Sequence, residues 1–367
     1  MNKFLYLIEY FNEEPIIIQV VWLLSCVLFV TAIVLILYLK TLRSHLRKNE
    51  KNISKFENEY ESNLIAYLYS GNEEEMISKE QFAIISKMKT GILDSFKRKI
   101  FVSVLLKLKN EISGEMEESI QNLYNQTNLK SYAEAKLNSR DWYAIASGIR
   151  ELTLFQVKEA HSKIVKFSNH PRKEVRKEVQ LYLVSLFSFE GLNFLNDLET
   201  SLSEWDQIQL LEELQKFENQ QIPDITLWLK SKNEYVVIFA LKLAKIYNQF
   251  EMSEVLLDLL NHKSEKVRLE LIPVLSHLYV VDAKEILKNN FSKSSIDEKI
   301  VFFKLLENLA DVNDEPFILE HIHHENFEIK FSALKILKNC NINTFKSLEL
   351  VPSESEFVKI VKFIENN

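Results

Sequence analysis

The sequence predicts an all-α protein in which one transmembrane helix precedes a right-handed α-α superhelical solenoid of about seven helix pairs. Three observations carry this prediction. Apolar anchor positions recur at a nearly regular interval between positions 139 and 340, and a period of this length indicates stacked repeats. Residues 16–39 form a run without charge. The 367 residues include only five glycines and six prolines, so tight β-turns are scarce.

The N-terminal part predicts a membrane anchor. Residues 1–15 are a short aromatic segment, and residues 16–39 are apolar enough for a helix that crosses a hydrocarbon core of about 30 Å. A cleaved signal peptide is the competing interpretation. It requires a basic start, a shorter apolar core and a small-residue cleavage site, and the sequence offers none of these features. We therefore expect a single-pass membrane protein.

Basic residues on the two flanks predict the orientation of this span. Lys3 precedes it, whereas five basic residues follow it: Lys40, Arg43, Arg47, Lys48 and Lys51. Lys and Arg accumulate on the cytoplasmic side of a membrane. The N-terminus should thus face outward and the solenoid should lie in the cytoplasm, as in a bacterial inner-membrane protein. The same five residues are suited to contact anionic lipid headgroups.

Between the span and the repeats, the sequence predicts two helical segments. Residues 40–78 should form a basic juxtamembrane helix and an acidic linker, and the sequence leaves open whether this helix continues the transmembrane helix. Residues 79–138 lack the repeat spacing and predict one helix over 79–112, followed by two shorter ones, as a cap. Residues 341–367 contain a second candidate cap, an amphipathic helix over 355–364. Caps are needed because the end faces of a solenoid would otherwise expose its core.

The repeats over residues 139–340 are defined by apolar anchors with a small or polar residue five positions earlier. The polar positions suit helix caps, and the anchors suit a shared core. The anchors are Ala144, Val175, Ile208, Val236, Val267, Ile300 and Ile329, and the preceding positions are Ser139, His170, Ser203, Ser231, His262, Ser295 and His324.

Two stretches carry a resemblance to a known family. They are Leu259-Leu-Asn-His-Lys-Ser-Glu-Lys-Val267-Arg268 and Val165-Lys-Phe-Ser-Asn-His-Pro-Arg-Lys-Glu-Val175-Arg176. Their pattern resembles the HEAT repeat, a subclass of the armadillo-like helical repeats. The resemblance implies stacked helix pairs that offer an extended surface to a protein partner. The period here is shorter than the usual HEAT length.

The sequence predicts no enzyme, no metal site and no cofactor. It contains no phosphate-binding glycine loop and no nucleophile motif. The histidines of the cluster His321, His323 and His324 lack the companions of a zinc site. His324 also occupies the same repeat position as His170. Cys26 and Cys340 are far apart in sequence and imply no disulfide framework.

Charge argues against a general nucleic-acid partner, because the net charge is -7 and such binders present a basic face. One local basic segment contains Lys163, Lys166, Arg172, Lys173, Arg176 and Lys177. Glu174 and Glu178 dilute it, and we expect no interleaved aromatic platform of the kind that single-strand binding requires.

The function that these features favour is a membrane-anchored scaffold or adaptor that binds a protein partner on the cytoplasmic side. Recognition should lie on a solenoid face, where exposed aromatic residues are favoured contact points. The candidates are Trp205, Trp228, Tyr235 and Tyr279, although such residues can also pack between repeats. The alternative is a nucleic-acid-binding or catalytic helical solenoid whose site has no recognisable motif.

Overall fold

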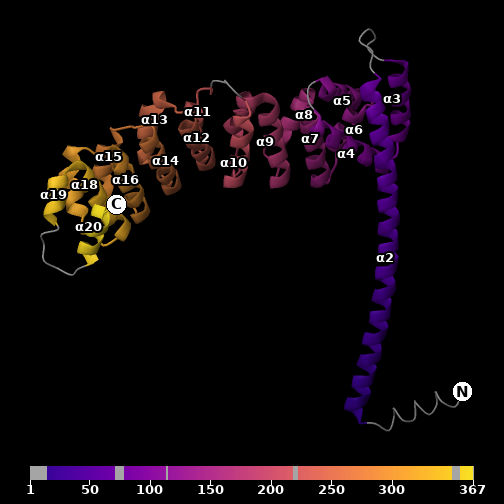
Figure 1. Ribbon diagram of the computed structural model, residues 1–367, viewed down its shortest axis with the longest axis horizontal. Coiled ribbons are helices and arrows are strands. Elements are labelled where there is room, and N and C mark those ends of the chain that lie inside the picture. The colour runs from indigo at the N-terminus through magenta and orange to yellow at the C-terminus, as the bar shows by residue number, and fades with distance from the viewer. Residues whose placement is uncertain (1–14, 71–77, 113–114, 218–221, 349–355, 367) are drawn as a thin grey trace. The chain divides into compact units, whose positions relative to one another are not determined.

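The structure is a computed structural model that describes residues 15–70, 78–112, 115–217, 222–348 and 356–366. Within these residues all regular secondary structure is helical, and no strand occurs, so the all-α prediction is confirmed. The chain divides into two compact units, Met1–Ser131 and Tyr132–Asn367, and each is described by itself (Figure 1).

The first unit contains a helix of 54 residues, α2 (Ile16–Tyr69). Its apolar part has a mean hydropathy of 3.0 and no buried residue, and by length and composition it can cross a membrane. The predicted span and the juxtamembrane helix are therefore one continuous helix. Only the far end of α2 is packed, where Tyr60, Leu64 and Tyr67 are buried.

The helix predicted over residues 79–112 is wrong in one respect, because the chain forms two helices there. They are α3 (Lys79–Gly91) and α4 (Ser95–Glu111). Asp94 interrupts the run by capping α4, since its carboxylate accepts hydrogen bonds from the N–H groups of Phe96 (2.7 Å) and Lys97 (3.2 Å). The two shorter helices are confirmed as α5 (Glu115–Gln126) and α6 (Leu129–Lys136). Residues 1–14 and the linker residues 71–77 lie outside the described residues.

The second unit is built on seven long helices that begin at a nearly constant interval. The residues at their N-terminal caps follow one another almost evenly along the chain: Asp141, Arg172, Ser203, Asn233, Ser264, Ser295 and Asn326. The helices are α7 (Trp142–Leu154), α9 (Lys173–Phe187), α10 (Glu204–Gln215), α12 (Glu234–Ile246), α14 (Glu265–His277), α16 (Ile296–Leu309) and α18 (Phe327–Cys340). Positions equally distant from these caps are therefore structurally equivalent.

Shorter helical segments connect the long helices, and Figure 1 shows α7, α9, α10, α12 and α14 following one another in chain order. The connecting segments are η1 (Lys158–Ala160), α8 (His161–Ile164), η2 (Val165–Phe167), η3 (Ser188–Asp197), α11 (Thr226–Leu229), η4 (Phe250–Met252), α13 (Ser253–Asp258), η5 (Leu259–Asn261), α15 (Ala283–Asn290), η6 (Phe291–Lys293), η7 (Val312–Asp314) and α17 (Glu315–His321). The chain ends with α19 (Ile342–Ser347) and α20 (Glu356–Asn366). The latter is the helix predicted over residues 355–364, and it packs on α18.

The core of the second unit follows the cap register. The positions seven and eleven residues after each cap are buried in all seven long helices. The eleventh position is Ala244 in α12 and a leucine in the other six: Leu152, Leu183, Leu214, Leu275, Leu306 and Leu337. These two positions lie on one side of a helix, so each long helix buries the same stripe.

Two of the seven predicted anchors lie out of register with this core. Val175, Val236, Val267 and Ile329 are fully buried, as predicted, and Ala144 is half-buried. Ile208 is 43% exposed, and Ile300 is only half-buried.

The cause of this error is a difference in cap chemistry. In five repeats the predicted polar residue lies two positions before the cap and accepts a hydrogen bond from the cap's backbone N–H at 3.0 to 3.2 Å. These residues are Ser139, His170, Ser231, His262 and His324. Ser203 and Ser295 are instead the caps themselves. The sequence analysis treats all seven polar residues as equivalent. In these two repeats it therefore selects Ile208 and Ile300, which lie two positions further from the cap than the buried anchors and turn away from the core.

Close approach between neighbouring segments depends on one glycine. Gly191 lies in η3, which packs against α9. A Cβ atom at this position would lie 2.1 Å from the carbonyl oxygen of Leu183. Only glycine allows this contact between backbones.

Candidate functional site

The outer side of the long helices carries a row of mostly apolar residues that the core stripe leaves uncovered. It occupies the fifth position after each cap, which lies away from the buried positions. Ile208 is 43% exposed, and Leu269, Ile300 and Phe331 are half-buried. The full row is Ala146, Lys177, Ile208, Ile238, Leu269, Ile300 and Phe331, of which Ile238 is the buried member.

Aromatic residues line the same side in three repeats, at the second position after the cap. Tyr143 is 60% exposed and Trp205 is 62% exposed, while Tyr235 is half-buried. Trp205 and Ile208 are three positions apart on α10, so their side chains are neighbours on the helix surface. We call the second-position and fifth-position residues together the long-helix face. A surface with exposed aromatic and aliphatic side chains is typical of protein interfaces.

The four aromatic residues predicted as contact points occupy different surroundings in the structure. Trp205 and Tyr235 lie on the long-helix face. Trp228 is buried, and its indole N–H donates to the Asn196 side chain at 2.7 Å. Tyr279 is 69% exposed, but it lies beyond the C-terminal end of α14. The sequence interpretation missed Tyr143 and the fifth-position row, and the cap interval is the signal that identifies them.

Ion pairs between consecutive long helices brace the long-helix face. Arg150 on α7 binds the buried carboxylate of Glu178 on α9, with its Nε at 3.1 Å. This carboxylate raises the pKa of Arg150 further. Lys335 on α18 binds Glu307 on α16 at 2.5 Å. Such contacts fix the spacing of the helices that present the face.

The charge around Trp205 is acidic. Its immediate neighbours on α10 are Glu204 and Asp206, and Glu212 and Glu213 follow along the same helix. Glu213 accepts a hydrogen bond from Ser185 on α9 at 2.8 Å. Glu213 is also paired with Lys216, so the acids beside Trp205 are Glu204 and Asp206. This arrangement favours a partner with basic residues beside an apolar centre.

Two histidines of the cluster, His321 and His324, stack with ring centres 6.1 Å apart, and each of the three also has other partners. His324 accepts a hydrogen bond from the Asn326 N–H at 3.0 Å, and burial lowers its pKa. His321 packs against Phe317 with ring centres 4.5 Å apart, and His323 packs on Phe357 at 4.5 Å. Across the described residues, no three His, Cys, Asp or Glu side chains are grouped to hold a metal ion. Cys26 and Cys340 are both free thiols.

The two basic segments have different surroundings. Lys40, Arg43, Arg47, Lys48 and Lys51 are all exposed on α2, directly after its apolar part. In the second segment Lys163 pairs with Glu134 at 2.7 Å, and Arg176 donates to the carbonyl of His170 at 2.8 Å.

The expectation that no aromatic residue accompanies the second segment is wrong in space. The Arg172 guanidinium lies 6.0 Å from the centre of the Trp142 ring, and Tyr143 is exposed beside this tryptophan in the chain. The sequence could not show this contact because it joins residues from the starts of two successive long helices.

Comparison with known proteins does not define a family for this chain. No family model matches it, and no curated protein matches it. Among solved structures, the crystal structure of an engineered protein is similar, with 14% sequence identity and a TM-score of 0.37 over 84% of this chain and 98% of that chain. Similarity at this level identifies no family, so the function is inferred from the residues themselves.

Proposed function

We propose that this chain is a single-pass membrane scaffold that binds a protein partner through the long-helix face. The observation that carries the proposal is the exposed Trp205–Ile208 pair on α10, which lies within rows of partly exposed aromatic and aliphatic residues. Tryptophan is enriched among residues that dominate binding energy. Exposed apolar side chains that gather on one face of a soluble domain mark interaction sites.

The proposal includes the architecture of the array. We infer that the long and short helices form a right-handed α-α solenoid of about seven HEAT-like pairs. The nearly constant cap interval and the contacts between most consecutive pairs of long helices support this inference. Solenoids bind partners through extended surfaces of equivalent residues, and the long-helix face is such a surface.

The anchor defines where the partner would be held. The apolar part of α2 supplies the span, and the five exposed basic residues after it favour a cytoplasmic array in a bacterial inner membrane. Anionic headgroups would add about 1 kcal/mol for each basic residue near the surface. A reporter that is active only in the cytoplasm should work when it follows Asn367. Activity confined to an exported reporter at that position would reverse the orientation.

Site-specific photocrosslinking tests the binding face. A photoreactive amino acid at Ile208 should give a defined crosslinked product in cells. The same amino acid at Leu227, which is 65% exposed but lies off the face, should not give that product. Trp205→Ala should weaken the crosslink while leaving the thermal unfolding unchanged. Equal crosslinking at Ile208 and Leu227 would refute the face.

Anchor and array should also be separable, because a tether acts only by raising local concentration. A protein that lacks residues 1–39 should still crosslink through Ile208 but should not bring the partner to membranes. An unrelated span of the same orientation should restore recruitment. If the exchanged span abolishes recruitment while the array stays folded, the span itself makes a specific contact and the tether role is wrong.

One observation favours a second candidate function. Arg172 and Trp142 combine a cation and an aromatic ring, and both charge and stacking are used to bind single-stranded nucleic acid. For this function, binding of a labelled oligonucleotide should weaken steeply with salt and should fall with Arg172→Ala. Binding that Arg172→Ala leaves unchanged would exclude this site.

A further inference from the structure

A second exposed apolar row lies just beyond the C-terminal ends of three consecutive long helices, α12, α14 and α16. Phe250, Val281 and Val312 each lie seventeen positions after a helix cap, so they are equivalent in successive repeats. They are 56%, 52% and 64% exposed. Each lies at or next to the start of the following short helix. We call these three residues, together with Tyr279, the turn edge.

The residues beside this row are acidic. Glu251 follows Phe250, Asp282 follows Val281, and Asp311 precedes Val312. All three acids are exposed. Lys245 is an exposed base at the end of α12, so the charge of the turn edge is mixed but predominantly negative.

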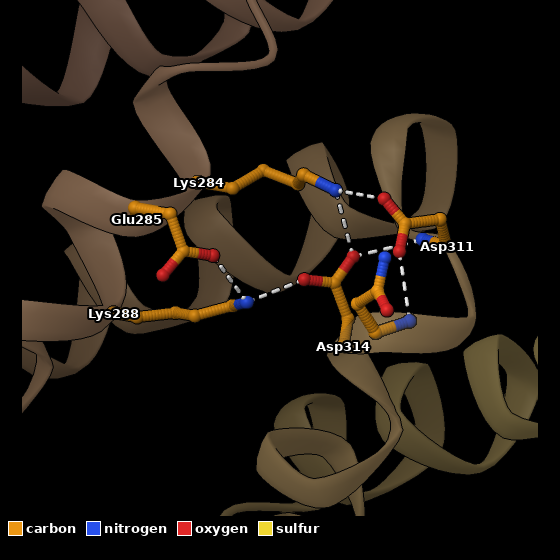
Figure 2. A network of polar contacts seen from close by, with 6 residues as sticks. Lys284, Glu285, Lys288, Asp311 and Asp314 are labelled. Carbon is orange, nitrogen blue, oxygen red and sulfur yellow. Dashed lines mark hydrogen bonds and ion pairs between the residues drawn. The ribbon is translucent and has the colours of Figure 1, made fainter.

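Two lysines bind acids at the Val312 end of the row and offset part of its negative charge there. Figure 2 shows Lys284 of α15 pointing at Asp311 and Asp314, which flank Val312. Its ammonium lies 2.7 Å from Asp311 and 2.8 Å from Asp314. Lys288 binds the other oxygen of Asp314. This network ties the segment after Val281 to the segment that carries Val312, and so fixes the distance between two members of the row.

Backbone strain marks the same edge. Tyr279 has a φ of 54°, in the left-handed region that usually belongs to glycine. It ends α14 in a Schellman motif, in which the Val280 N–H donates to the Leu275 carbonyl and the Tyr279 N–H donates to the Ser276 carbonyl. The same left-handed conformation recurs at Gln156 and Asn248 in other repeats, so it belongs to the helix ends, and the particular feature of Tyr279 is a large exposed aromatic ring at such a position.

We propose that the turn edge is a docking surface for an amphipathic helix of a partner protein, with basic residues flanking its apolar stripe. The spacing supports a helix. Neighbouring helices pack about 8–10 Å apart, and an α-helix advances about 10.5 Å in seven residues. Apolar residues seven apart on one partner helix therefore meet Phe250, Val281 and Val312 in turn. The exposed carboxylates of Glu251 and Asp282, which lie outside the lysine network, favour basic flanks on that helix. The proposal is independent of the long-helix face, which lies on another side of the same helices.

The test uses full-length protein in nanodiscs of zwitterionic lipid and a fluorescent helical peptide of about 21 residues. The peptide carries leucine at seven-residue intervals and lysine on both flanks. Its fluorescence anisotropy should rise on binding, after subtraction of empty discs. Val281→Ser should raise the Kd at least about fivefold. Asp282→Asn should raise the Kd and reduce its salt dependence. A peptide with glutamate in place of lysine should not bind.

Two controls decide the outcome. Leu227→Ser removes an equally exposed apolar residue elsewhere and should leave the Kd unchanged, as should Trp205→Ala on the long-helix face. The proposal is overturned if Val281→Ser and Leu227→Ser have the same effect, or if both charge forms of the peptide bind equally. It is also overturned if Val281→Ser changes the oligomeric state in nanodiscs, because a second copy would then be the occupant. Failure of this test leaves the crosslinking test at Ile208 unaffected.

Discussion

Asn169 and Asn233 bind the same short turn between η3 and α10. Asn169 precedes this turn in the chain, and Asn233 follows it. The Asn169 amide donates to the carbonyl of Asp197 at 2.8 Å, and its oxygen accepts from the Glu199 N–H at 3.1 Å. The Asn233 amide donates to the carbonyls of Leu198 (2.8 Å) and Thr200 (3.0 Å). Two repeats are thus joined through one turn by side-chain bonds to backbone, which satisfy polar groups that packing alone would leave unpaired.

The first prediction concerns these two asparagines. Asn233→Ala removes both bonds to the turn and also the cap of α12, where its oxygen accepts from the Tyr235 N–H. We expect a loss of about 2–3 kcal/mol in the free energy of unfolding. Asn169→Ala is the matched control, because it removes two bonds but no cap, and should cost about 1 kcal/mol less. Denaturant titration followed by circular dichroism measures both. Equal losses would contradict the role of the cap.

The second prediction tests the core register with two residues that the sequence made equivalent. Val267 is fully buried and Ile208 is 43% exposed. Val267→Asp places an unpaired charge in the core and should cost several kcal/mol. Ile208→Asp remains in contact with water and should change stability by no more than about 0.5 kcal/mol. Thermal unfolding of the two variants compares them directly. A severe loss from Ile208→Asp would show that Ile208 belongs to the core after all.

The third prediction concerns the network of Lys284, Lys288 and Asp314. Burial alone would raise the pKa of Asp314, but hydrogen bonds from Lys284 and Lys288 outweigh burial and lower it. Burial alone would lower the pKa values of Lys284 and Lys288, but their hydrogen bonds to carboxylates outweigh burial and raise these pKa values. The stability that ionised Asp314 contributes to the fold is therefore present above its unfolded pKa of about 3.9, and it is lost as the pH falls through the folded pKa. The stability that the charged lysines contribute is present below about pH 10.4, and it is lost as the pH rises through their folded pKa values.

Asp314→Asn should remove this pH dependence. Near neutral pH it should cost about 3 kcal/mol, because Lys284 and Lys288, both largely buried, each lose one of the two carboxylates that bind them. The difference between wild type and variant should shrink below about pH 4 and above about pH 10.4. Glu285→Gln is the control, since the Glu285 side chain is 71% exposed and its ion pair contributes little. A constant difference across the whole pH range would rule out titration of the network as the source.

The fourth prediction separates stability from binding at Tyr279. Tyr279→Gly relieves the left-handed strain and should raise the free energy of unfolding by about 0.5–1 kcal/mol. It also removes an exposed ring from the turn edge and should weaken the binding of the basic helical peptide. Gln156→Gly makes the same backbone change at the equivalent end of α7, at a φ of 51°, and should gain stability without a comparable loss of peptide binding. If both variants bind the peptide as wild type does, the strain at Tyr279 has no role in docking.

Local patterns in the sequence determine the helices, the membrane-length apolar run and the repeat period. Each depends on residues close together in the chain: apolar spacing, cap chemistry and the scarcity of glycine. The sequence predicts one helix over residues 79–112, whereas the structure has two. The break depends on whether the Asp94 carboxylate caps the N–H groups of Phe96 and Lys97.

Tertiary structure decides which side of each long helix is covered. Ile208 and Val267 are both apolar residues near the start of a helix, yet one faces solvent and the other the core. The difference arises because Ser203 is a cap while His262 supports a cap two positions later. The pairing of Lys284 with Asp314, a residue of the next repeat, likewise depends on how neighbouring repeats stack. Burial is a property of the neighbours that cover a side chain, and those neighbours come from distant parts of the chain.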